Sequence, residues 1–216
     1  MVLPVRSFII GSVMGDSAAD ALFPAFLKLS GLPVLVVGGG TVAAAKLEAL
    51  APTGARIVVV APHFCDAVAR SGAELRQRPF EASDLDDVWF VVSAATPEVN
   101  RTVSEAARAR RLFVNAVDDP PNASVYLGGV VRRAGATIAI STSGRAPALA
   151  GLLREGLDAL LPEDLDDWFD QADRLKAIWR SSGVPMVDRR PQLAEALLGR
   201  YCGSLESCRM RKASGS

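Results

Sequence analysis

Residues 33–43 read PVLVVGGGTVA, and this stretch decides the fold. The four apolar residues before the glycines are typical of a buried parallel strand, and the alanine-rich segment 41–51 predicts a helix. Between them, Gly38, Gly40 and Ala43 fill the dinucleotide-binding pattern G-x-G-x-x-A. Gly38 allows a tight turn, Gly40 has no Cβ to hold a pyrophosphate away from the backbone, and Ala43 lets the helix approach the strand. The alternative is a simple strand-to-helix turn.

Length and composition limit the number of domains and the classes of function that the chain can have. A chain of 216 residues, half of them hydrophobic, suits one large domain or a domain with a smaller appendage. Lys and Arg balance Asp and Glu at 24 each, so no overall charge attracts nucleic acid. The single histidine, His63, excludes a histidine-rich metal site, and no apolar run is long enough to span a membrane. The three cysteines, Cys65, Cys202 and Cys208, are an odd number. They therefore predict that the protein is in a reducing compartment, the cytoplasm.

Strands and helices alternate after the glycine turn. Further buried or edge strands are predicted over residues 56–61, 74–78, 88–94 and 112–117. Helical segments are predicted between them, over residues 65–70 and 97–110. Strands separated by helices predict an α/β fold with a mostly parallel, right-handed sheet. We therefore expect a Rossmann-type NAD-binding domain over residues 21–117, after an irregular extension over residues 1–20.

The pattern changes beyond residue 117. Two strands, 124–132 and 137–141, predict a hairpin that needs burial against another chain, so we expect a dimerisation region over residues 118–147. The rest predicts a C-terminal helical domain over residues 148–201, with helices at 148–160, 164–180 and 191–201. The small and polar residues 202–216 predict a disordered tail.

The end of the second strand lacks the acidic residue that usually holds the ribose of a dinucleotide. Ala61 occupies that position and is followed by Pro62 and His63. Sugar recognition would then rest on the backbone and on these two residues, although His63 could equally be a solvated loop residue. The only arginine beside this strand is Arg56, at its other end, which favours NAD over NADP.

Two polar segments follow the fifth strand. Asp118 stands just past its carboxyl end, where open α/β sheets bind ligands, and its carboxylate could accept a proton. Asp118 or its neighbour Asp119 could instead form the turn before the two prolines, and the spacing does not decide between them. The loop 141–145, STSGR, could bind an anion, or Ser143 could be the N-cap of the next helix.

Several motifs, in this order, resemble the precorrin-2 dehydrogenase and sirohydrochlorin ferrochelatase family. The similarity extends over residues 22–180 and includes GGGTVAAAK at 38–46, VVAP at 59–62, SAAT at 93–96, NAVD at 115–118, STSGRAP at 141–147 and LLRE at 152–155. The resemblance implies NAD-dependent oxidation of precorrin-2, followed in many members by insertion of Fe²⁺ to give siroheme. It also implies a homodimer interlocked through the middle region.

The resemblance assigns roles to individual residues. The catalytic aspartate corresponds to Asp118, and no residue is assigned to a resident metal. Cofactor contacts correspond to residues in three loops: Gly38, Gly39, Gly40, Thr41, Val42, Pro62, His63, Ala94 and Thr96. Contacts to the tetrapyrrole substrate are expected from Asn115, Thr142, Ser143, Arg145 and Arg154. Two positions depart from the family: Thr142 stands for a serine that one branch phosphorylates, and Ala45 stands for a frequent arginine.

Three alternatives remain. The chain could oxidise precorrin-2 without inserting metal, as some relatives do. It could be another NAD enzyme on the same fold, although neither Tyr126 nor Tyr201 has the lysine four residues later that small-ketone reductases use. It could also be a non-catalytic NAD-sensing module.

Overall fold

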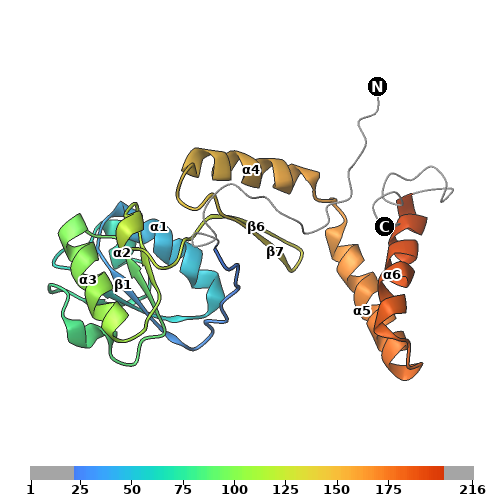
Figure 1. The fold of residues 1–216 in the computed structure, drawn as a ribbon, viewed down its shortest axis with the longest axis horizontal. Coiled ribbons are helices and arrows are strands. Elements are labelled where there is room, and N and C mark those ends of the chain that lie inside the picture. The colour runs from blue at the N-terminus through green and yellow to red at the C-terminus, as the bar shows by residue number, and fades with distance from the viewer. Residues whose placement is uncertain (1–21, 202–216) are drawn as a thin grey trace. The chain divides into compact units, whose positions relative to one another are not determined.

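The computed structural model describes residues 22–201. Its largest feature is a five-stranded parallel sheet in the order β3-β2-β1-β4-β5. Figure 1 labels β1 of this sheet and the helices α1, α2 and α3 around it. The strands are β1 (Pro33–Val37), β2 (Arg56–Val60), β3 (Glu74–Arg76), β4 (Phe90–Ser93) and β5 (Val114–Ala116). Val37 pairs with Val60 on one side and with Ser93 on the other, so the carboxyl ends of the central strands lie level. Because the chain order reverses between β1 and β4, their carboxyl ends form the place where open α/β sheets bind ligands.

Helices cover both faces of this sheet. They are α1 (Thr41–Leu50), α2 (Asp66–Ala69) and α3 (Pro97–Ala109). On one face Val36 packs in a cluster with Ala43 of α1, and on the other Val37 packs with Val103 of α3. Ala43 is fully buried, which confirms that its small side chain allows close packing on the sheet. None of the described helices is long and apolar enough to cross a membrane.

The described chain divides into two compact units. The first comprises residues 22–129 and 140–151, and the second comprises residues 130–139 and 152–201. The elements after β5 are β6 (Gly129–Arg133), β7 (Ala136–Ile140), α4 (Pro147–Leu160), α5 (Leu165–Ser181) and α6 (Met186–Tyr201). Within the second unit, Trp179 Nε1 of α5 donates to Gln192 Oε1 of α6 at 2.6 Å.

The predicted domain boundaries, 21–117, 118–147 and 148–201, stay a prediction. The predicted N-terminal extension and the predicted disordered tail lie outside the described residues.

The predicted α/β fold with a parallel sheet and a helical C-terminal region is confirmed. Two element boundaries were wrong. The strand predicted from Ser124 begins only at Gly129, because the Ser124 and Val125 amides instead donate to the Val114 carbonyl along the edge of β5. The helix predicted from Pro191 begins at Met186 and contains that proline. Pro185 and Asp188 were the start signals, and a proline in the second turn removes only one backbone hydrogen bond.

Candidate functional site: a dinucleotide site at the carboxyl edge of the sheet

The glycine turn after β1 is shaped by the two segments beside it. Gly38 has a φ of 129°, and a Cβ there would collide with the Ala94 carbonyl oxygen. A Cβ on Gly39 would collide with the His63 carbonyl oxygen. The Cys65 amide donates to the Gly39 carbonyl at 2.7 Å, which holds the segment after β2 against the turn. Gly38 and Gly39 are therefore required for packing within the protein.

Gly40 differs from its neighbours. It is the N-cap of α1 with an ordinary φ of −88°, and a Cβ there would meet no atom within 4 Å. Within residues 22–201 no side chain caps α1, and the first turn contains no acidic residue. The open space and uncapped N–H groups suit an anion, because the helix N-terminus carries a partial positive charge. The turn from Gly38 to Val42 thus fits the pyrophosphate of a dinucleotide.

The end of β2 is also close to an arginine, contrary to the sequence-based expectation. Parallel pairing puts the end of β3 beside it, and the Ala61 amide donates to the Arg76 carbonyl at 3.3 Å. The Arg76 guanidinium, however, lies 2.9 Å from Glu74 and 3.4 Å from Asp84, so carboxylates compensate its charge. His63 is exposed, as either interpretation of it requires.

The loop after β4 is held by a residue of α3 that the sequence analysis missed. Asn100 of α3 is 1% exposed, and its Oδ1 accepts hydrogen bonds from Ser93 Oγ at 2.7 Å and from the Ala95 amide at 3.2 Å. These bonds fix the loop that carries Ala94 and Thr96. The available signal was an asparagine on the apolar face of an amphipathic helix, where an unpaired amide would be costly.

The turn after β5 separates the two candidate aspartates. Asp118 is exposed and has a left-handed φ of 55°, which costs on the order of 1 kcal/mol in a non-glycine residue. No residue in the described range bonds to its carboxylate. Asp119, in contrast, accepts hydrogen bonds from Asn122 Nδ2 at 2.9 and 3.1 Å and so forms the turn. The Asp118 carboxylate therefore remains available for chemistry.

Asn115 precedes this turn inside β5 and is 5% exposed. Its Nδ2 donates to the Val125 carbonyl at 2.9 Å, while its Oδ1 is buried without a partner among the described residues. The side chain is therefore held inside β5, and its contact with the substrate stays a prediction.

The STSGR loop lies beside the Asp118 turn. Gly144 has a left-handed φ of 74°, and a Cβ there would lie 3.3 Å from the Tyr126 ring and 3.7 Å from Pro120. Thr142 Oγ1 donates to the Ala146 carbonyl at 3.1 Å, and the Arg145 amide donates to the Thr142 carbonyl at 3.0 Å. A hollow of about 340 Å³ is lined by Thr142, Arg145, Ala146 and Leu149.

Two details of this region differ from the expectations. Ser143 is not the N-cap of the next helix, because α4 begins four residues later, at Pro147. The loop turns back first, with Ser143 in the left-handed region. Arg154 belongs to the second compact unit, where its guanidinium pairs with Glu155 at 3.1 Å.

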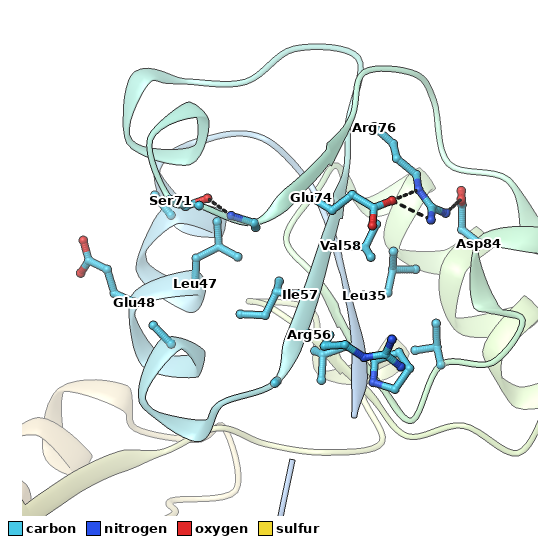
Figure 2. Close-up of a pocket in the computed structure, with 18 of the residues that line it drawn as sticks. Leu35, Leu47, Glu48, Arg56, Ile57, Val58, Ser71, Glu74, Arg76 and Asp84 are labelled. Carbon is cyan, nitrogen blue, oxygen red and sulfur yellow. Dashed lines mark hydrogen bonds and ion pairs between the residues drawn. The ribbon is translucent and has the colours of Figure 1, made fainter. Parts of the chain in front are cut away.

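A larger cavity, of about 1000 Å³, lies along β2 and β3 (Figure 2). Its lining runs from Arg56, the first residue of β2, to Arg76, the last residue of β3. The residues of the glycine turn, 38–42, are not among those that line it. Within residues 22–201 no group of three or more His, Cys, Asp or Glu side chains is arranged to hold a metal ion.

Comparisons with known proteins agree with this geometry. Residues 25–129 match the family model described as putative NAD(P)-binding. The chain is 37% identical over 195 residues to a siroheme synthase of Sodalis glossinidius, covering 88% of this chain and 41% of that protein. It is 40% identical over 172 residues to siroheme synthase 2 of Cronobacter sakazakii, covering 77% of this chain and 38% of that protein. The chain thus spans about two fifths of the length of these relatives.

A solved structure shares the fold. The precorrin-2 dehydrogenase SirC superposes with a TM-score of 0.62 at 24% identity, covering 81% of this chain and 88% of that one. Residues 25–129 therefore match a family described as putative NAD(P)-binding, and the chain is similar in sequence to siroheme synthases over about two fifths of their length.

Proposed function

We propose that the chain oxidises precorrin-2 to sirohydrochlorin with NAD as the hydride acceptor. The observation that carries this proposal is the Asp118 carboxylate, which is exposed and unbonded at the edge of the sheet that bears the glycine turn. The similarity to siroheme synthases supports the choice of substrate.

The nucleotide would be held by backbone and small side chains. The Gly40, Thr41 and Val42 backbone would bind the pyrophosphate, and Pro62 and His63 would line the adenosine side. Ala94 and Thr96, at the end of β4, would line the nicotinamide side. NAD, when bound, accepts a hydride. Among the described residues, the arginine at the end of β2 is Arg76, and its pairing with Glu74 and Asp84 supports NAD over NADP.

The oxidation removes one hydride and one proton from the substrate. Bound NAD would supply the hydride acceptor, and the Asp118 carboxylate would accept the proton at an Oδ atom. Precorrin-2 carries several carboxylates, so its site needs local positive charge. Arg145 would supply part of that charge beside the Asp118 turn, and the hydroxyl groups of Thr142 and Ser143 would add hydrogen bonds to the substrate carboxylates. The contacts expected from Asn115 and Arg154 stay predictions.

Insertion of Fe²⁺ into sirohydrochlorin is the second candidate activity, and the same unbonded carboxylate favours it. Metal insertion must remove two pyrrole protons, for which a positioned carboxylate is a suitable acceptor. We further propose a homodimer formed near residues 124–143. A cytoplasmic location agrees with the free thiol of Cys65, since thiols persist in reducing compartments.

The test is anaerobic incubation of the purified protein with precorrin-2 and NAD while NADH absorbance is followed. We expect NADH and sirohydrochlorin in equal amounts, and siroheme after Fe²⁺ is added. NADH without siroheme would indicate a dehydrogenase alone. NAD binding without turnover would overturn the proposal in favour of a nucleotide-sensing module. NADH formation only with an added small hydroxy compound would indicate another dehydrogenase.

A further inference from the structure

Buried polar side chains are concentrated on one side of the sheet. Apart from Asp84, the buried polar or charged side chains in the described part of the chain are Ser93, Asn100, Ser104 and Asn115. All four lie on β4, α3 or β5, the elements that carry the predicted nicotinamide loop and Asp118. Since a buried polar group is costly unless it is bonded, their common location calls for an explanation.

Helix α3 contributes two of these side chains on one face. Asn100 and Ser104 are four residues apart, which puts them on the same side of the helix about 6 Å apart along its axis. The apolar residues Val103 and Ala107 of the same face are fully buried against the sheet. Asn100 and Ser104 therefore project from a helix that is fixed in place by its core packing.

Each of the two side chains bonds to a different loop of the site. Asn100 Oδ1 accepts hydrogen bonds from Ser93 Oγ and the Ala95 amide and so fixes the loop after β4. Ser104 Oγ donates to the Asn122 carbonyl at 2.6 Å. The Asn122 side chain in turn donates to both carboxylate oxygens of Asp119, the residue next to Asp118.

Asp118 needs such support because its backbone is in the left-handed region. Its other neighbour, Val117, is held by an amide hydrogen bond to the Ser93 carbonyl at 2.8 Å. Asp118 is thus held on one side by the end of β4 and on the other by α3 through Asn122 and Asp119.

We propose that α3 positions both the cofactor and the base. Asn100 positions the nicotinamide loop, and Ser104 positions the turn that carries Asp118. This inference rests on the proposed function, because it gives Asp118 the role of base. Asn100 and Ser104 are positioning residues that touch neither cofactor nor substrate. Their spacing along a rigid helix sets the distance between the hydride acceptor and the proton acceptor.

The test compares Asn100→Ala and Ser104→Ala with the matched control Thr102→Val. Thr102 lies on the same helix, and its hydroxyl bonds to the Glu98 carbonyl on the exposed side. For Asn100→Ala we expect the Kd for NAD to rise about tenfold. For Ser104→Ala we expect turnover at saturating substrates to fall about 10- to 10²-fold with an unchanged Kd for NAD. Thr102→Val should change neither quantity.

The amide NMR signals of residues 117–119 provide a readout that does not depend on turnover. We expect them to shift or broaden in Ser104→Ala and to stay in place in Thr102→Val. The inference is overturned if both α3 variants lose affinity and turnover together in proportion to a fall in Tm, or if Ser104→Ala behaves as the control does. If the wild-type protein does not oxidise precorrin-2, the proposed function fails, while the NAD affinities and the NMR signals still decide whether α3 positions both loops.

Discussion

At the scale of single residues, the adjacent aspartates Asp118 and Asp119 have different surroundings, and we expect their replacement to have different effects. Asp118→Asn keeps the shape of the side chain, and asparagine tolerates the left-handed backbone at this position. Removal of a positioned base should slow the step that it serves by roughly 10²- to 10⁴-fold. We expect this loss to be strong in metal insertion and smaller in NADH formation, with the Kd for NAD unchanged in calorimetry.

Asp119→Asn is the matched control. Because Asp119 bonds Asn122 and so supports the turn, its replacement should lower the free energy of unfolding by about 1 kcal/mol and slow metal insertion less than Asp118→Asn does. A fully active Asp118→Asn together with an inactive Asp119→Asn would show that the wrong aspartate has been assigned.

Gly40 and Gly39 give a second prediction, in which neighbouring glycines respond differently. A Cβ at position 40 meets no protein atom within 4 Å and the φ is ordinary, so Gly40→Leu should fold and keep its Tm within a few degrees. Its side chain would occupy the space predicted for the pyrophosphate and abolish measurable NAD binding. Gly39→Leu should instead fail to fold stably, since a Cβ there collides with the backbone of His63. If Gly40→Leu retains its affinity for NAD, the cofactor site lies elsewhere in the protein.

Arg145 tests how the substrate is held. Its guanidinium borders the hollow next to Thr142, and a carboxylate-rich substrate should pair with it. Arg145→Ala should therefore raise the KM for precorrin-2 more than it lowers kcat, which steady-state kinetics will separate. Arg111→Ala is a control that removes an equal charge beyond the end of α3. An unchanged KM in Arg145→Ala would exclude this arginine from the site.

At the scale of elements, the segment that connects β3 and β4 contains only a short helical turn. A buried carboxylate holds this segment in place. Asp84, in the short helical turn Ala82–Leu85, has a side chain that is 1% exposed. It accepts hydrogen bonds from Arg78 at 2.5 and 2.8 Å and from the Glu81 amide at 2.9 Å (Arg76 and Asp84 are shown in Figure 2). Burial alone would raise the pKa of Asp84, but these donors hold the pKa below its ordinary value.

A lowered pKa in the folded state gives a stabilisation that is complete above the unfolded-state pKa of about 3.9 and is lost as the pH falls toward the folded-state value. We expect the free energy of unfolding, measured in urea, to decrease as the pH is lowered below about 4. Asp84→Asn should cost roughly 1.5–3 kcal/mol at neutral pH and flatten this decrease. Asp86→Asn, which removes an exposed ion pair with Arg110, should cost less than about 1 kcal/mol. Equal effects of both variants would contradict the role of burial.

The elements differ in how far the sequence could predict them. Strands β1, β2 and β4 were predictable because their apolar runs are buried on both faces. Asn100 and Ser104 were not, because polar residues on the buried face of α3 look like interruptions of its pattern until their partners are known. Asp118 and Asp119 could not be ranked by spacing, since only the folded turn pairs Asp119 with Asn122. Arg76 was missed for a related reason: only strand pairing brings it beside Ala61.

At the scale of the whole molecule, the helix after the hairpin carries apolar side chains that the described residues leave exposed. Strands β6 and β7 form a sheet of two strands, which is marginal in water. Helix α4 exposes four leucines and buries only Ala150: Leu149, Leu152, Leu153 and Leu160 are 44–79% exposed. Such a surface is typical of a protein–protein contact, and we propose that α4 extends the homodimer interface predicted near residues 124–143.

We therefore expect light scattering at micromolar concentration to give twice the mass of the chain. Leu152→Glu should shift the protein toward the monomer, because Leu152 is 66% exposed on α4 and a buried charge would weaken the contact. Val187→Glu is the matched control, since Val187 is 78% exposed on α6 and outside the predicted interface. A monomeric wild-type protein would contradict the prediction, and equal dissociation by both variants would contradict its location. If the dimer also completes the substrate site, Leu152→Glu should lose turnover as it dissociates but retain NAD binding, because the glycine turn and its neighbours lie within one unit of a single chain.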